Sequence, residues 1–197
     1  MLLSGGTFLP AFPRRRGQAG SITQKRGITV KQLNHYETMQ IIRPCHSELV
    51  LCLCGVTCEN FGLILRTADV FAVSRIIYLG REPENERKFQ KISRGAAVQV
   101  EFTRDTGFID ALRGDGYKVY ALEITDQSVP LRTFSFPAKT CLIVGNERHG
   151  VPEELLTLAD GACYIEMYGA NISSLNVSVS TAIAVNRYME YNFGGAK

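Results

Sequence analysis

Short, continuous apolar segments alternate with helix-like segments along most of the chain, and this alternation constrains the fold more than any other feature. "LVLCLCG" and "TCLIV", for example, show no alternation of polar and apolar residues. Such strands are covered on both faces, which is typical of a parallel sheet flanked by helices. The predicted strands are Leu49–Gly55, Arg75–Leu79, Val98–Phe102, Tyr117–Ile124, Thr140–Val144 and Ala162–Glu166. The sequence therefore predicts an α/β fold, a parallel sheet with helices on both faces.

The helices are predicted from apolar periodicity and from capping residues. Thr29 and Gln32 have the spacing of a capping box, and Pro44 ends the helix that follows them. Ser174 is placed to cap the closing helix. The predicted helices are Thr29–Arg43, Phe61–Phe71, Phe108–Arg113, Pro152–Leu158 and Ser174–Tyr191.

The first 27 residues differ in charge from the rest of the 197-residue chain. Residues 1–27 carry five basic residues and no acidic one, so the remainder is net −2 within a total of +3. We predict a flexible basic N-terminal arm at residues 1–27 and one domain at residues 28–197. Three interpretations of the arm stay open: it is a disordered tail, a source of phosphate contacts or an organellar presequence. The expected location is cytoplasmic, with a mitochondrial one as the alternative. No apolar run approaches the roughly 20 residues of a membrane span.

The six cysteines do not form a disulfide or zinc pattern. No CxxC pair is present, and a chain of this size does not need disulfides, which favours a reducing compartment. Cys52 and Cys54 share one face of a strand and are expected to pack as small apolar groups. The alternative is a metal site formed by Cys45, His46 and Cys58, although the spacing of these residues is wrong for the common zinc patterns. We predict no metal.

The stretch "ENFGLILRTADVFAV" follows a strand directly. Asn60 is a predicted N-cap, and Gly62 permits close approach of backbone or ligand. Arg66 lies about one turn further on. Two readings of Arg66 stay open: an ion pair with Asp69, or a guanidinium at the carboxyl end of a strand, where open α/β sheets bind ligands.

In "CLIVGNERHGVPEEL" a buried strand runs into Gly145, Asn146 and Glu147. A glycine at a strand's end indicates a tight turn or backbone exposed to a ligand. The stretch has neither the phosphate-loop pattern nor G-x-G-x-x-G, so the ordinary ATP and NAD fingerprints are absent.

The stretch "SSLNVSVSTAIAVNRY" begins a helix with small polar groups. Asn176 and Ser180 share one face, while Leu175, Val179 and Ile183 line another. Small residues on the same helix permit close approach of a neighbour. The pattern predicts a helix that contacts its own core, a ligand and a second subunit.

Taken together and in this order, the three stretches resemble the SpoU-type RNA ribose 2′-O-methyltransferases of the SPOUT superfamily. The resemblance covers roughly Gln40 to Tyr191, and "GNERHGVP" is most similar to the branch that methylates tRNA guanosine in the D-loop. It implies a C-terminal trefoil knot, a homodimer, and S-adenosyl-L-methionine as methyl donor. The implied function is methylation of the ribose 2′-OH of a structured RNA, with tRNA favoured over rRNA. A non-catalytic RNA-binding dimer is the alternative from another class, and a nucleotide-dependent oxidoreductase is disfavoured by the missing fingerprint.

The resemblance also implies roles for individual residues. Arg66 is the implied catalytic residue; because a guanidinium stays protonated, we expect it to hold the target phosphate and stabilise the developing alkoxide. The residues implied to orient Arg66 and the ribose are Asn60, Glu147, Ser174 and Asn176. Those implied to contact the cofactor are Leu142, Val144, Gly145, Asn146, Ile165, Met167 and Leu175. Besides Arg66, the RNA-binding residues are predicted to be Arg87, Lys88, Lys91 and Arg94, either a phosphate track or simply a solvated charged face.

Overall fold

A computed structural model describes residues 32–42, 44–81 and 92–194. The chain divides into two units, Met1–Ile42 and Arg43–Lys197. In the first unit the described residues form one helix, α1 (His35–Ile41), with Asn34 and Glu37 as its capping box. The predicted helix start is wrong for the described residues, because residues 32–34 are not helical and α1 begins at His35; Thr29, the other member of the predicted capping pair with Gln32, lies outside the described residues. The arm at residues 1–27 lies outside the described residues.

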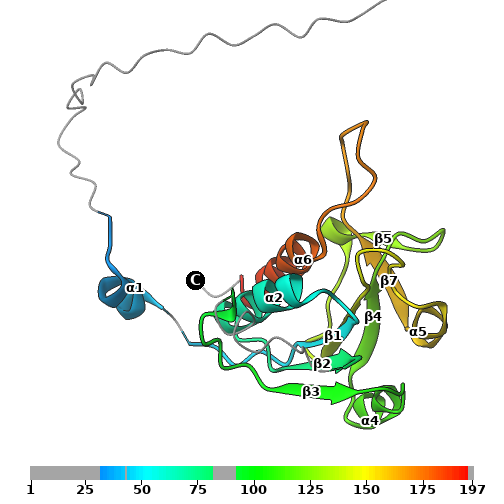
Figure 1. The fold of residues 1–197 in the computed structure, drawn as a ribbon, viewed down its shortest axis with the longest axis horizontal. Coiled ribbons are helices and arrows are strands. Elements are labelled where there is room, and N and C mark those ends of the chain that lie inside the picture. The colour runs from blue at the N-terminus through cyan, green and yellow to red at the C-terminus, as the bar shows by residue number, and fades with distance from the viewer. Residues whose placement is uncertain (1–31, 43, 82–91, 195–197) are drawn as a thin grey trace, which may run out of the picture. The chain divides into compact units, whose positions relative to one another are not determined.

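The second unit contains a sheet in which every neighbouring pair of strands is parallel (Figure 1). The strand order is β3-β2-β1-β6-β4-β7-β5. This confirms the predicted parallel sheet. The strands are β1 (Val50–Cys54), β2 (Arg75–Leu79), β3 (Val100–Thr103), β4 (Lys118–Leu122), β5 (Val129–Pro130), β6 (Thr140–Val144) and β7 (Gly161–Tyr164).

Helices cover both faces of this sheet, as predicted. Helices α2 and α6 lie on one face, and α4 and α5 lie on the other (Figure 1). A short 3-10 helix, η1 (Leu131–Thr133), follows β5. Among the described residues of this unit, the α-helices with given bounds are α2 (Cys58–Val70), α4 (Phe108–Gly114), α5 (Glu153–Leu158) and α6 (Val177–Phe193).

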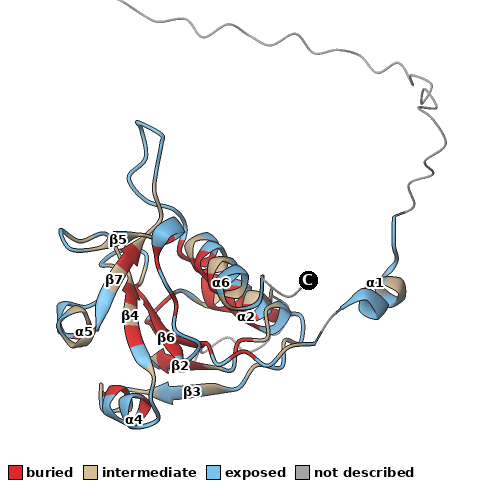
Figure 2. Ribbon diagram, turned by 180° about the vertical axis from the view of Figure 1, so that it is seen from behind, coloured by how far each residue is buried: buried red, intermediate tan, exposed pale blue. Residues whose placement is uncertain are grey.

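The core has two layers because successive side chains of a strand point to opposite faces. In β1, Leu51 and Leu53 pack in the cluster that contains α2 and α6 residues, whereas Cys52 and Cys54 pack in the one that contains α4 and α5 residues. All five residues of β1 are buried, as Figure 2 shows for the central strands. The two cysteines thus pack as small apolar groups, which confirms the prediction.

Strand boundaries differ from the prediction at the edge of the sheet that contains β4, β7 and β5. β4 ends at Leu122, so Glu123 and Ile124 lie beyond it. β7 ends at Tyr164 and leaves Ile165 and Glu166 outside the ladder. β5 was not predicted, because two residues that include a proline carry almost no strand signal.

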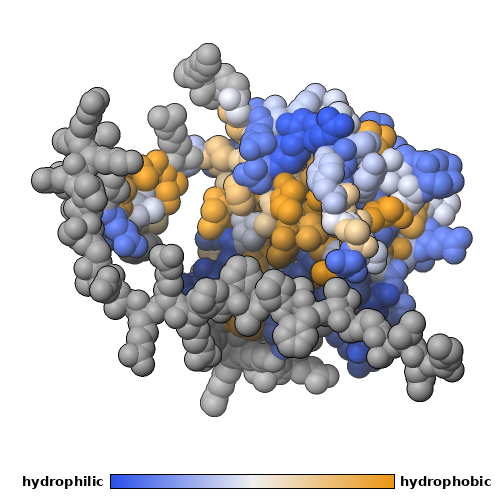
Figure 3. Space-filling model, turned by 90° about the horizontal axis from the view of Figure 1, so that it is seen from above, coloured by the Kyte–Doolittle hydropathy of each residue, from blue (hydrophilic) through white to orange (hydrophobic). Residues whose placement is uncertain are grey.

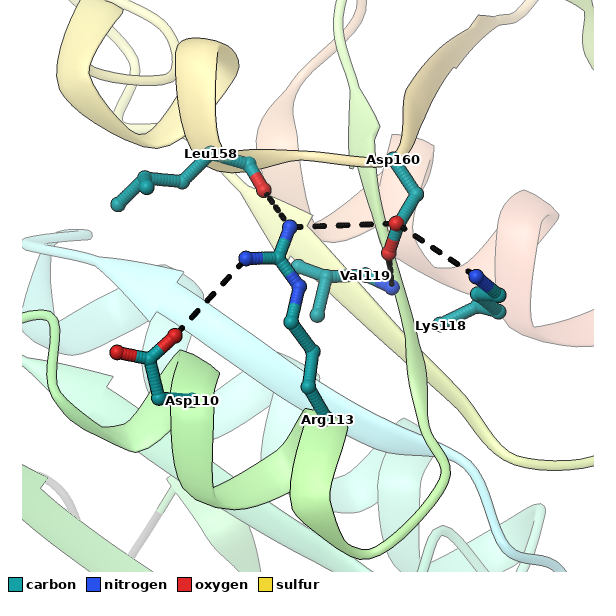
Figure 4. Close-up of polar contacts among 6 residues, drawn as sticks. All are labelled: Asp110, Arg113, Lys118, Val119, Leu158 and Asp160. Atoms are coloured by element: carbon teal, nitrogen blue, oxygen red, sulfur yellow. Dashed lines mark hydrogen bonds and ion pairs between the residues drawn. The ribbon is translucent and has the colours of Figure 1, made fainter.

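Asp160 joins α4, β4 and the chain before β7 (Figure 4). Its Oδ2 accepts a hydrogen bond of 2.8 Å from the backbone N–H of Val119. Its Oδ1 lies 3.9 Å from Arg113 Nη2 and 3.8 Å from Lys118 Nζ. Arg113 also donates to the carbonyl of Leu158. The Asp160 side chain therefore joins β4 to the residue directly before β7, next to the backbone pairing of these two strands.

We expect Asp160→Ala to lower the free energy of unfolding by about 1–3 kcal/mol, because the buried N–H of Val119 loses its acceptor. Asp160→Asn keeps an oxygen at that place and should cost less. Chemical denaturation of the three proteins measures the difference. Lys118→Ala, which removes only an exposed partner, is the control; equal losses for Asp160→Ala and Lys118→Ala would contradict the assignment.

Candidate functional site

A cavity of about 530 Å³ opens at the carboxyl ends of β4, β6 and β7. Open parallel sheets bind ligands at this edge. The cavity walls consist of residues 122–124 at the end of β4, residues 144–148 and Gly150 at the end of β6, Tyr164, Ile165 and Met167 at the end of β7, and residues 174–177 with Ser180 around the start of α6.

The loop after β6 is a tight turn closed by its own backbone. Asn146 and Gly150 exchange two hydrogen bonds of 3.1 Å, and Asn146 Oδ1 accepts from the N–H groups of Arg148 and His149. A Cβ on Gly145 would lie 2.0 Å from the carbonyl carbon of Gly150. Only glycine fits at position 145, so the backbone at the cavity floor is set by this contact.

Glu147 leaves that turn and binds the start of α2. Its Oε1 accepts hydrogen bonds from the backbone N–H of Thr57 at 3.2 Å and from the Thr57 hydroxyl at 2.9 Å. Asn60 Nδ2 donates to the same oxygen. One carboxylate oxygen therefore ties the loop after β6 to the loop after β1.

Asn60 extends the network to the third segment. It is buried, and its Oδ1 accepts a hydrogen bond of 3.1 Å from Asn176 Nδ2. Asn60, Glu147 and Asn176 are therefore joined, although 116 residues separate the first from the last along the chain. These hydrogen bonds bring the three motif segments together at one place.

Two predicted caps are wrong, and the actual caps explain the polar start of α6. Thr57, not Asn60, caps α2, which leaves the amide of Asn60 available for Glu147. Asn176, not Ser174, caps α6: its Oδ1 accepts from the N–H groups of Ser178 and Val179. The Ser178 hydroxyl donates to the same atom at 2.6 Å. The small polar residues therefore fix the orientation of Asn176.

The pKa of Glu147 is lowered. Burial of the carboxylate acts to raise it, but the hydrogen bonds donated by Asn60 and Thr57 outweigh that effect. The group is therefore ionised near neutral pH and acts as a hydrogen-bond acceptor, which excludes it as a proton donor in the resting site.

This shift predicts a pH-dependent stability. Because the folded-state pKa lies below the unfolded one, the stabilisation from Glu147 is present above the unfolded pKa and is lost as the pH falls through the folded pKa. Wild type should exceed Glu147→Gln in unfolding midpoint at pH 7, and the gap should close in acid. Thermal unfolding of both proteins between about pH 7 and 3 tests this, with Glu101→Gln, an exposed position on β3, as control. A gap that does not change with pH would contradict the prediction.

Arg66 lies on α2 but not in the cavity wall. Its side chain is exposed, on the same side of the helix as the exposed Leu63 and Val70. The alternative partner Asp69 instead accepts a hydrogen bond of 3.2 Å from the backbone N–H of Ala97. Arg66 is thus available to a molecule that approaches α2 from outside this chain.

The residues predicted to contact a cofactor lie at the cavity, with one exception. Val144, Gly145, Asn146, Ile165, Met167 and Leu175 all line it, as does Ser174. Leu142 does not: it is fully buried in the core between the sheet and α6, because it lies two residues before the end of β6.

The predicted phosphate track falls mostly outside the described residues, which do not include Arg87, Lys88 and Lys91. Arg94 is described and exposed, with a positive φ of 54° directly after a short helical segment. Among the described residues no group of three or more His, Cys, Asp or Glu could hold a metal, Cys45, His46 and Cys58 included. In the same part of the chain, no helix has the length and apolar character that a membrane span requires.

Two residues of the site were missed by the sequence analysis. Thr57 precedes Asn60 by three residues, so the spacing of a cap and its first-turn partner was the available signal. Glu123 lines the cavity after β4. Its signal was an acidic residue at the end of a predicted strand, which is too common to single out.

Comparison with known proteins gives one family. A model described as the SpoU rRNA methylase family matches residues 48–186. The chain is 40% identical over 128 residues to the tRNA (guanosine(18)-2′-O)-methyltransferase of Thermus thermophilus, covering 64% of this chain and 65% of that protein. It is 33% identical over 134 residues to the tRNA (guanosine(18)-2′-O)-methyltransferase TARBP1 of Mus musculus, covering 66% of this chain and 8% of that protein.

The fold is also similar to that of solved structures. The AdoMet-bound rRNA methyltransferase from Sinorhizobium meliloti superposes with a TM-score of 0.69 and 28% identity, covering 77% of this chain and 59% of that one. The chain spans from 8% to 65% of the length of the curated relatives named above.

Proposed function

The chain belongs to the SpoU rRNA methylase family, and from this membership we propose that it transfers a methyl group from S-adenosylmethionine to the ribose 2′-hydroxyl of a tRNA guanosine. The relatives named for guanosine 18 of tRNA support that nucleotide as the target. Ribosomal RNA is the second candidate, supported by the name of the structural relative.

The observation that carries the proposal is the hydrogen-bonded network of Asn60, Glu147 and Asn176 beside the cavity. The network joins the turn after β6 to the first turns of α2 and α6. Methyl transfer requires a nucleophile, a carbon and a leaving sulfur in line, and holding reactants in such a geometry can remove about 7–11 kcal/mol of a barrier. A site with this rigidity suits such a reaction.

The cavity suits S-adenosylmethionine in size and chemistry. Its volume of about 530 Å³ lies within the range of small-molecule sites. When bound, the sulfonium donor supplies an electrophilic methyl group. Val144, Ile165, Met167 and Leu175 offer apolar surface, and the backbone at Gly145 and Asn146 offers carbonyl and N–H groups.

Arg66 is the residue we assign to the reacting hydroxyl. It bears a permanent positive charge, and it lies on the helix whose first turn is bound by Glu147. A guanidinium can bind a phosphate with two parallel hydrogen bonds and stabilise the oxyanion as the 2′-hydroxyl loses its proton to water or phosphate.

We propose a homodimer in which α2 and α6 form the interface. Apolar side chains gather on the face of the molecule seen in Figure 3. The two helices pack together and expose Leu63, Val70, Val179 and Ile183. Because Arg66 lies among these residues, a second copy docked there would bring Arg66 of one protomer towards the cavity of its partner.

Replacing Ile183 with glutamate tests the dimer. We expect the variant to be monomeric and to lose activity, since a charge would be buried in the interface. Light scattering coupled to size-exclusion chromatography measures the mass. Val129→Lys, at an exposed position on the edge strand β5, is the control and should stay dimeric. A dimeric, active Ile183→Glu protein would show that this face is not the interface.

The remaining proposals concern topology and location. We propose that the C-terminal part is threaded as a trefoil knot, which is supported by β6 inserting between β1 and β4 after the chain has reached the edge at β5. We propose a cytoplasmic location, with a mitochondrial one as the alternative; six free cysteines support a reducing compartment.

Arg94, with the basic residues before it, is proposed to contact RNA phosphates.

The function is tested with labelled S-adenosylmethionine and tRNA transcripts. We expect methylation of a transcript with guanosine at position 18 and none when that nucleotide is 2′-deoxyguanosine, which lacks the nucleophile. A ribosomal RNA fragment is the competing substrate. Binding of tRNA without methyl transfer to any RNA would favour the non-catalytic dimer.

A further inference from the structure

Glu123 is a carboxylate in the cavity wall that no motif of the three segments includes. It follows β4 directly, beside the loop that closes β6. The cavity has one other carboxylate, Glu147, whose Oε1 is engaged by Thr57 and Asn60. Glu123 follows β4, which lies between the central strand β6 and the edge strands β7 and β5.

Backbone groups hold this carboxylate in place. Its Oε2 accepts a hydrogen bond of 2.9 Å from the N–H of Val151, and its Oε1 accepts one of 2.9 Å from the N–H of Ile124. The N–H of Glu123 donates to the carbonyl of Cys163 at 3.0 Å. A Cβ on Gly150 would lie 2.3 Å from Oε2, so the turn approaches the carboxylate as closely as a glycine permits.

Within the described residues Glu123 has no cationic partner, because the ion pairs there involve Asp110, Asp160 and Glu166. Each of its oxygens accepts one backbone hydrogen bond and keeps a further lone pair. A half-buried carboxylate fixed by two N–H groups is a pre-organised acceptor for a ligand that brings hydroxyl or ammonium donors.

Resting on the proposed function, we infer that Glu123 accepts hydrogen bonds from the ribose hydroxyl groups of the S-adenosyl donor and so selects a ribonucleoside. A planar carboxylate with two oxygens matches the two adjacent hydroxyls of a ribose. In other open parallel sheets an acidic residue binds the ribose of a nucleotide in this way. The cation at sulfur adds a favourable long-range interaction with the same charge.

The test combines variants with ligands that lack one hydroxyl. Calorimetry measures the affinity of wild type and Glu123→Gln for S-adenosylhomocysteine and for its 2′-deoxy and 3′-deoxy analogues. For wild type we expect one or both analogues to bind about 10- to 100-fold more weakly, the range of a charged hydrogen bond. In Glu123→Gln, S-adenosylhomocysteine should lose a similar factor, and the difference between it and the deoxy analogue should largely disappear.

Two controls isolate the ribose. 5′-Methylthioadenosine keeps the ribose and lacks the amino acid, so its binding should also weaken in Glu123→Gln. Glu166→Gln changes a carboxylate that is bound to Arg132 and lies outside the cavity wall, and it should leave all affinities unchanged. Glu123→Asp, which keeps the charge on a shorter side chain, replaces Glu123→Gln if the latter does not fold. In this variant too, the difference in affinity between S-adenosylhomocysteine and its deoxy analogues should largely disappear.

Opposite results would overturn the inference. If removal of a ribose hydroxyl weakened binding equally in wild type and variant, Glu123 would not contact the ribose and would only hold the turn through the N–H of Val151. Normal binding of 5′-methylthioadenosine by the variant would place the carboxylate against the amino group of the donor instead. If wild type does not bind S-adenosylhomocysteine at all, the proposed function itself fails, and the inference with it.

Discussion

Arg66→Ala should reduce single-turnover methylation of tRNA by about 10²- to 10³-fold, the loss typical of removing one group that stabilises a developing oxyanion. Donor affinity should be unchanged, because Arg66 does not line the cavity. Thermal stability should also be unchanged, since the side chain is exposed. Arg66→Lys keeps the charge but loses the planar, two-pronged donor, so its rate should fall between the two.

Arg104→Ala, at an exposed position after β3, is the matched control for loss of one positive charge. It should weaken RNA binding slightly, if at all, and leave turnover intact. Rapid quench with radiolabelled donor measures the chemical step, and filter binding measures RNA affinity. If Arg66→Ala retains the wild-type rate with saturating RNA, Arg66 has no part in stabilising the reacting oxygen.

Gly145→Ala should weaken the binding of S-adenosylhomocysteine, and it should slow methyl transfer by about 10²-fold, the cost of a misplacement of about 1 Å in a reacting geometry. The added Cβ would lie 2.0 Å from the carbonyl carbon of Gly150 and 2.3 Å from the nitrogen of Val151. Both are backbone atoms, so no side-chain rotation can relieve the overlap. The turn must move, and with it the cavity floor and the N–H of Val151 that donates to Glu123.

Gly169→Ala is the matched control in the same region. It lies in the loop before α6, and a Cβ there would meet no atom within 4 Å. Calorimetry should give wild-type affinity for this variant, and thermal unfolding should show a lower midpoint only for Gly145→Ala. Wild-type binding by Gly145→Ala would mean that the turn has a second conformation that preserves the site.

Most strands were predictable because a buried strand of a parallel sheet is a short, continuous apolar segment of the sequence. β2 (Arg75–Leu79) and β6 (Thr140–Val144) have the predicted bounds, since both are short apolar segments with clear ends. β5 was missed because its two residues are specified by pairing with β7 and not by their own preference. The ends of β4 and β7 were predicted too late because apolar residues continue beyond them, Ile124 after β4 and Ile165 after β7, and both of these line the cavity.

The polar residues show the limit of sequence reasoning more sharply. Asn60 and Ser174 each satisfied the rules for an N-cap, yet Thr57 and Asn176 cap the helices. Capping preferences are local, whereas Asn60 is held by Glu147, which is 87 residues away. A tertiary partner therefore decided which of two suitable residues took each role.

The sequence by itself determined the parallel sheet, its two covering layers and the three segments that carry the site, because apolar periodicity and short motifs are properties of neighbouring residues. Only the tertiary structure decided the strand order, the capping residues, the burial of Leu142 away from the cavity and the placement of Glu123 within it. These depend on contacts between residues far apart in the chain, and the free energy of such contacts is fixed by geometry that no local pattern encodes.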